Sequence, residues 1–136
     1  MTPQQKLKHA ILIRQHEMYP TDPLPHDSIT GDEIDALYEK IDNAGNLGDA
    51  KEEVRTCGNE SSILFVCPPG YHMAQRNYEC DEVAYQTPHG WVGYTYWYGG
   101  GKHSEPSAIE WMAFSYDLDC KEKPITIIQQ TFTKVA

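Results

Sequence analysis

The stretch WVGYTYWYGGGKHS, from Trp91 to Ser104, places five aromatic residues and four glycines in fourteen positions. Aromatic and β-branched residues favour a pleated surface and the run ends in glycines, so residues 91–98 are predicted to form a strand. Alternation puts bulky side chains on both faces, which indicates a central strand. We expect one face to pack against helices and the other to be a half-exposed tyrosine surface. Core packing alone also accounts for the aromatic residues.

The three glycines after this strand free the backbone to adopt positive φ and to approach a ligand closely. A short helix is expected near residues 105–112, and a glycine loop with a lysine before a helix N-terminus is one way in which chains bind anions. The pattern is neither a P-loop nor a dinucleotide fingerprint, and a tight turn with a solvated lysine explains it equally. The candidate ligand-binding residues are Tyr96, Tyr98, Gly99, Gly100, Gly101, Lys102 and His103.

The 136-residue length and the 40% apolar composition indicate one globular domain. Residues 1–58 are predicted to be helical and acidic, and residues 59–136 to form a sheet with the short helix near 105–112. No apolar run approaches the roughly 20 residues needed to span a bilayer, and the N-terminus does not resemble a signal peptide. We therefore expect a cytoplasmic protein, with reduced cysteines and no contact with membranes.

Two capping boxes mark the starts of helices, at Thr2 with Gln5 and at Thr30 with Glu33. The apolar spacing that follows predicts helices over residues 3–18, 31–43 and 47–55, with His9 and His16 at the surface. Strands are expected at residues 63–66, 83–87, 91–98, 114–120 and 125–135, with residues 71–80 ambiguous. The fold class is α+β, with N-terminal helices packed on a mainly antiparallel four- or five-stranded sheet.

The net charge of −9 is unevenly distributed along the chain. Residues 1–16 carry +3, residues 17–60 carry −9 and residues 61–136 carry −3. This excess of acid excludes direct binding to a phosphate backbone, which needs basic patches. It fits a solvated acidic face, a basic partner or imitation of the charge of a nucleic acid. The candidate partner-binding residues are Asp32, Asp35, Glu39, Asp42, Asp49, Glu52 and Glu53.

Metal and catalytic motifs are weak. Cys57, Cys67, Cys80 and Cys120, with His72, lack the CxxC spacing of structural zinc sites, so we expect buried reduced thiols and neither metal nor cofactor. No nucleophile elbow accompanies His72, His89 or His103. Asp117 and Asp119 share one strand face and could do acid–base work, but alternating polar residues on an outer face need no such role. The only compact acid–base cluster is Lys102, His103 and Glu105.

The stretch YTYWYGGGKHSEPSAIEWM and the closing ITIIQQTFTKV resemble a group of small uncharacterised proteins encoded in bacteriophages and prophages. The resemblance covers residues 80–134 and implies no activity and no site residues. It implies only a setting, that of a phage accessory protein in the bacterial cytoplasm.

These features together predict a non-enzymatic phage-type protein that binds and inhibits a host protein. The target could be a nucleic-acid-binding defence complex, which an acidic, DNA-mimicking surface would block in the manner of an anti-CRISPR protein. The alternative is a protein or enzyme that binds a nucleotide or another anion at the Gly99–Ser104 loop. A third interpretation is a self-associating structural component.

Overall fold

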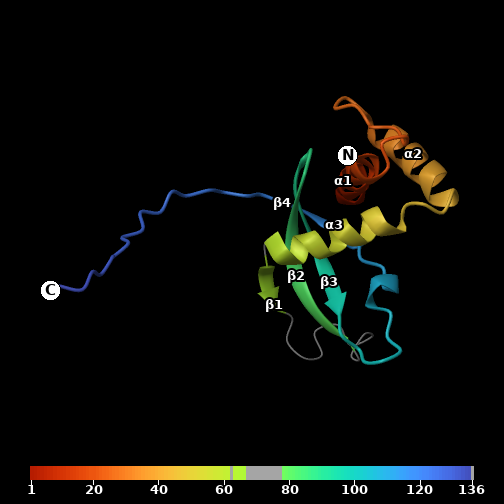
Figure 1. The fold of residues 1–136 in the computed structure, drawn as a ribbon. Coiled ribbons are helices and arrows are strands. Elements are labelled where there is room, and N and C mark those ends of the chain that lie inside the picture. The colour runs from red at the N-terminus through yellow and green to blue at the C-terminus, as the bar shows by residue number, and fades with distance from the viewer. Residues whose placement is uncertain (62, 67–77, 136) are drawn as a thin grey trace.

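The computed structural model describes residues 1–61, 63–66 and 78–135 of the chain. Three helices come first: α1 (Pro3–Met18), α2 (Gly31–Asn43) and α3 (Gly48–Ser61). They are followed by β1 (Ile63–Val66), β2 (Glu79–Thr87), β3 (Gly90–Tyr98), the 3₁₀ turn η2 (Pro106–Ala108) and β4 (Tyr116–Leu118). Helices α1 and α3 both contact β2 and β3, and α2 packs on α1 (Figure 1). The predicted α+β class is confirmed.

The first two helices begin where the sequence predicts. The Thr2 side chain accepts a hydrogen bond from the Gln5 backbone N–H, and the Gln5 side chain accepts one from the Thr2 N–H. Thr30 and Glu33 make the same reciprocal pair at the start of α2. These bonds satisfy N–H groups that a helix leaves without internal partners. Helix α3 is longer than predicted, since it continues past Arg55 to Ser61.

The strands form an antiparallel sheet in the order β1-β2-β3-β4. Strands β2 and β3 are a hairpin, paired in register from Glu79 opposite Tyr98 to Thr87 opposite Gly90. Strand β3 is central, as predicted, because β4 pairs along its other edge.

The tyrosine face of β3 packs against the helices, contrary to the prediction, although Tyr96 and Tyr98 near its end are only half-buried. Tyr94 is fully buried in the core, and Val92 beside it is buried as well. Alternation defines the two faces of a strand but does not say which one the helices cover. The core joins residues from both halves of the chain: Leu7, Ile11, Leu12, Ile29, Ile34, Tyr38, Ile41, Leu47, Ala50, Val54, Val83, Val92, Tyr94, Trp111 and Met112.

On the opposite face of the sheet, the Tyr116 ring of β4 lies across Gly93 of β3. A Cβ at Gly93 would stand 2.6 Å from the Tyr116 Cζ atom, so only glycine allows this crossing. The Tyr116 hydroxyl donates to a carboxylate oxygen of the buried Glu82 at 3.0 Å. Tyr116 therefore fastens β4, a three-residue strand, to the centre of the sheet.

Besides α3, four predicted elements differ in the structure. Strand β2 begins at Glu79 and not at the predicted Val83. The helix near 105–112 is replaced by the three-residue turn η2, and the strand over 114–120 is reduced to Tyr116–Leu118. The strand predicted over 125–135 does not form, and those residues are exposed and without regular structure. Most of the ambiguous segment 71–80 lies outside the described residues. Within the described ranges, no helix has both the length and the apolar character that crossing a membrane requires.

Candidate functional site

The glycine loop after β3 is held in one tight conformation. Gly99, Gly100 and Gly101 have φ angles of 76°, 88° and 89°, which side-chain-bearing residues rarely adopt. The Ser104 hydroxyl lies 2.7 Å from the carbonyl oxygens of both Gly99 and Gly101 and donates to them. A Cβ at Gly100 would overlap the Tyr78 ring. All three glycines are thus required by the turn itself.

The cationic residues of this loop, Lys102 and His103, are both exposed. The turn η2 has only three residues and does not provide the helix N-terminus expected behind the loop. An anion held here would therefore interact with the two side chains and with loop backbone, without a helix dipole. Binding of a ligand at this loop stays a prediction.

The two tyrosines assigned to this site are half-buried and make contacts within the protein. The rings of Tyr96 and Tyr98 stack on each other with centroids 5.5 Å apart. The Arg55 guanidinium lies over the Tyr96 ring at 4.8 Å, and the Tyr98 hydroxyl is 3.4 Å from a carboxylate oxygen of Asp81. The surfaces of these rings thus support α3 and β2.

Three of the seven carboxylates proposed for partner binding form ion pairs within the protein. Asp35 pairs with Lys8 at 3.0 Å, and Glu53 pairs with Arg14. The hydrogen bond from the Gln5 amide, with a smaller contribution from Lys8, lowers the pKa of Asp35. Glu52 binds Arg55 through both carboxylate oxygens, at 2.6 and 2.9 Å. These three carboxylates join the helices to each other and to the sheet.

The other four carboxylates are exposed, and none has a hydrogen bond or ion pair in the described part of the chain: Asp32, Glu39, Asp42 and Asp49. On α2, Asp32, Glu39 and Asp42 are spaced i, i+7 and i+10, which places them along one side of the helix. We call these three residues the acidic stripe. Lys40 is exposed on the same helix, but the stripe itself contains no basic residue.

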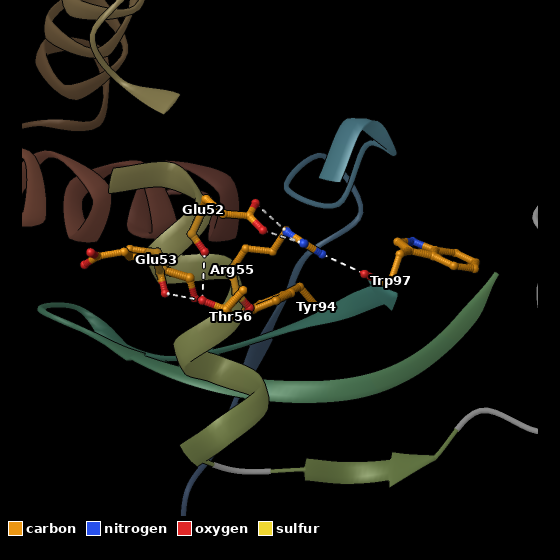
Figure 2. A network of polar contacts seen from close by, with 7 residues as sticks. Glu52, Glu53, Arg55, Thr56, Tyr94 and Trp97 are labelled. Carbon is orange, nitrogen blue, oxygen red and sulfur yellow. Dashed lines mark hydrogen bonds and ion pairs between the residues drawn. The ribbon is translucent and has the colours of Figure 1, made fainter. Parts of the chain in front are cut away.

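Figure 2 shows the buried arginine that joins α3 to β3. Arg55 is 5% exposed. Its Nη1 atom donates to the Trp97 carbonyl oxygen at 2.7 Å, and its Nε and Nη2 atoms donate to the Glu52 carboxylate. The Tyr94 hydroxyl donates back to the carbonyl oxygens of Val54 and Arg55, at 3.0 and 2.6 Å. Burial raises the pKa of Tyr94, so this hydroxyl stays protonated as a donor. Arg55 was not among the predicted functional residues, because its burial depends on Trp97 and Tyr96, which are distant in sequence.

The prediction that the cysteines are buried is only partly correct. Cys80 is buried, whereas Cys57 and Cys120 are exposed. Cys67 and His72 lie outside the described residues. Among the residues that the structure describes, no group of three His, Cys, Asp or Glu side chains is arranged to hold a metal ion. Asp117, considered above for acid–base chemistry, pairs with Lys6 of α1 at 2.6 Å.

The prediction that His9 lies at the surface is wrong. His9 is 1% exposed, and its Nδ1 atom is 2.7 Å from the Nε2 atom of His89 at the tip of the β2–β3 hairpin. One of the two nitrogens must donate, so the pair is held together with at least one neutral ring. No sequence pattern signals this contact, because 80 residues separate the two histidines.

Comparison with known proteins gives no relative. No protein-family model, no curated protein and no solved structure matches this chain. A function therefore has to be argued from the arrangement of its own residues.

The His9–His89 pair predicts a loss of stability in acid. Burial lowers the pKa of His9, the positive charge of His89 and His26 lowers it further, and Asp27 opposes this. In the unfolded chain the pKa of a histidine is about 6.5, so below this pH the unfolded state binds more protons than the folded state. The free energy of unfolding therefore falls as the pH falls below about 6.5. Urea unfolding across this range should give a shallower pH dependence for His9→Gln than for the wild type. Replacement of the exposed His103 by Gln should leave the dependence unchanged, and equal slopes for all three proteins would refute the assignment.

Proposed function

We propose that this chain is a non-enzymatic phage-type accessory protein that binds a host protein and occupies a basic surface used to hold nucleic acid. The observation that carries the proposal is the acidic stripe of α2. Its three carboxylates are exposed on one side of a helix, and they form no ion pair within the described part of the protein.

The stripe is held on a firm support. Ile34, Tyr38 and Ile41 bury the opposite side of α2 in the core. Asp35 fastens the flank of α2 to α1 through Gln5 at 2.9 Å and Lys8 at 3.0 Å. A side chain on a packed helix loses little further freedom when a partner binds it, which favours affinity.

The charge of the protein also favours such a partner. A net charge of −9 attracts basic surfaces over several ångströms and raises the rate of encounter with them. The partner surface that fits is a cluster of lysines and arginines, because such clusters hold phosphates in nucleic-acid-binding proteins. A stripe of carboxylates on a helix would compete with the phosphates for the same cations.

The test is capture of proteins from bacterial lysate on the tagged wild-type chain and on the variant Asp32→Asn/Glu39→Gln/Asp42→Asn. We expect the wild type to retain a basic nucleic-acid-binding protein that added DNA displaces, and the variant to lose most of it. Asp35, Glu52 and Glu53 are left intact, since their carboxylates are already paired with cations inside the protein.

The matched control is Glu79→Gln/Glu105→Gln/Glu122→Gln, which removes the same charge from exposed positions outside α2. It should retain the partner as the wild type does. Equal retention by all three proteins, or retention that DNA does not affect, would overturn the proposal. A thermal-shift scan with nucleotides at the glycine loop would then be the next experiment.

A further inference from the structure

The last described residues form an extended arm that leaves the body of the protein (Figure 1). We define the arm as residues 119–135; every one of them is exposed and none is in a helix or strand. Five large apolar side chains of the arm are between 81% and 89% exposed: Ile125, Ile127, Ile128, Phe132 and Val135. Proteins rarely leave a contiguous apolar segment in water unless it binds something.

The register of the sheet explains why the arm has no partner in its own chain. Strand β4 runs antiparallel to β3, with Leu118 opposite Trp91. In the same register Asp119 would face Gly90, where β3 begins after the hairpin turn. Strand β3 begins at this residue, so the arm continues beyond the end of β3 and has no neighbouring backbone to pair with. Beyond β4 its N–H and C=O groups have no partner on β3, and the edge strand of another chain would supply one.

The composition of the arm is that of a strand. From Ile125 to Val135 it is rich in isoleucine and threonine, with one phenylalanine and no glycine or proline. Such segments favour a pleated, half-buried surface. The local preference for a strand is therefore real, and what is missing is the neighbouring strand.

The arm and the rest of the chain carry opposite net charges, which favours binding of the arm to the body of another copy. It carries Lys121, Lys123 and Lys134 against Asp119 and Glu122, a net charge of +1. Since the whole chain carries −9, the other residues carry −10. Two bodies of this charge repel each other, so a contact between copies has to be made by a segment that reaches away from the body and is not acidic. The arm has both properties.

We propose that the arm binds a second copy of this chain, adding a strand to an edge of its sheet, and that the two copies exchange arms. Among the described strands, β1 and β4 are the edges of the sheet. Reciprocal exchange about a two-fold axis buries both arms and closes the assembly as a dimer. The inference does not depend on the proposed function, because it uses neither α2 nor its acidic stripe.

The first experiment is sedimentation equilibrium of the full chain over a range of concentrations. The wild type should reach twice the mass of one chain. The variant Ile127→Thr/Ile128→Thr/Phe132→Thr keeps the charge and the strand propensity but removes apolar contact area. It should raise the dissociation constant of the dimer by about 100-fold or more. The control Gln129→Thr/Gln130→Thr changes the same arm without removing apolar side chains and should remain dimeric.

Hydrogen exchange on the wild type locates the contact without any substitution. Amides of residues 125–135 should be protected at concentrations where the protein is dimeric and should exchange freely after dilution to the monomer. A wild type that stays monomeric throughout would overturn the proposal and favour a different protein as the partner of the arm. A dimer that survives the threonine variant, or whose arm amides exchange freely, would overturn it as well.

Discussion

Replacing Glu52 by alanine is expected to lower the free energy of unfolding by about 2 kcal/mol. Glu52 holds the Nε and Nη2 atoms of Arg55, whose guanidinium is almost completely buried between α3 and β3. Without the carboxylate, a buried cation keeps only the Trp97 carbonyl and the Tyr96 ring as partners. Breaking a fully buried ion pair typically costs about 3–5 kcal/mol, and we expect less here because the Glu52 side chain is partly exposed.

The neighbouring residue provides the control for this experiment. Glu53 also pairs with an arginine, Arg14, but the Arg14 side chain is 39% exposed whereas that of Arg55 is 6% exposed. Water screens such a pair, so Glu53→Ala should change stability much less than Glu52→Ala. The measurement is urea unfolding of the two variants and the wild type. Equal losses for the two variants would show that burial of Arg55 does not set the strength of its ion pair.

Replacing Gly58 by alanine should destabilise the protein by about 2 kcal/mol, although alanine is the better helix former. A Cβ at Gly58 would overlap the Tyr94 hydroxyl and stand 2.8 Å from the Tyr94 Cζ atom. Tyr94 is fully buried and cannot move aside without losing its hydrogen bonds to the carbonyls of α3. The gain in helix propensity, about 1 kcal/mol, is smaller than the combined cost of overpacking and a displaced hydrogen bond.

Gly48 is the matched position for Gly58. It lies at the start of the same helix, and no atom would stand within 4 Å of an added Cβ. Gly48→Ala should therefore be neutral or slightly stabilising. The double variant Gly58→Ala/Tyr94→Phe should lose less than the sum of its single changes, because the hydroxyl that clashes is gone. Thermal unfolding of the wild type, the two single variants Gly58→Ala and Tyr94→Phe, and the double variant measures this coupling. Strictly additive losses of stability would contradict it.

The sequence predicts local features of this fold well. The capping boxes at Thr2 and Thr30 mark the starts of α1 and α2, because a cap is formed by residues three positions apart. The aromatic run from Trp91 predicts β3 and its hairpin with β2 for the same reason. Each of these signals depends on neighbours within one element or one turn.

The errors concern contacts between distant residues. His9 was expected at the surface because its helix is basic, and it is buried because the hairpin tip brings His89 to it. Residues 125–135 have the composition of a strand, but a strand needs a neighbour, and the sheet offers none beyond Gly90. Of the carboxylates proposed for binding, only the structure distinguishes Glu52, which serves Arg55, from Glu39, which faces solvent.

The composition of the core has a consequence for how the chain is made. Leu7 and Ile11 of α1 pack in one cluster with Trp111 and Met112, and Lys6 pairs with Asp117. Ribosomes add about 5–20 residues per second, so some 5–20 s pass between completion of α1 and the appearance of Met112. For most of that time the β2–β3 hairpin that packs on α1 has not been made, and the Trp111–Met112 segment of the core is the last part to appear. The newly made N-terminal half is therefore a candidate for protection by a chaperone until the last strands emerge.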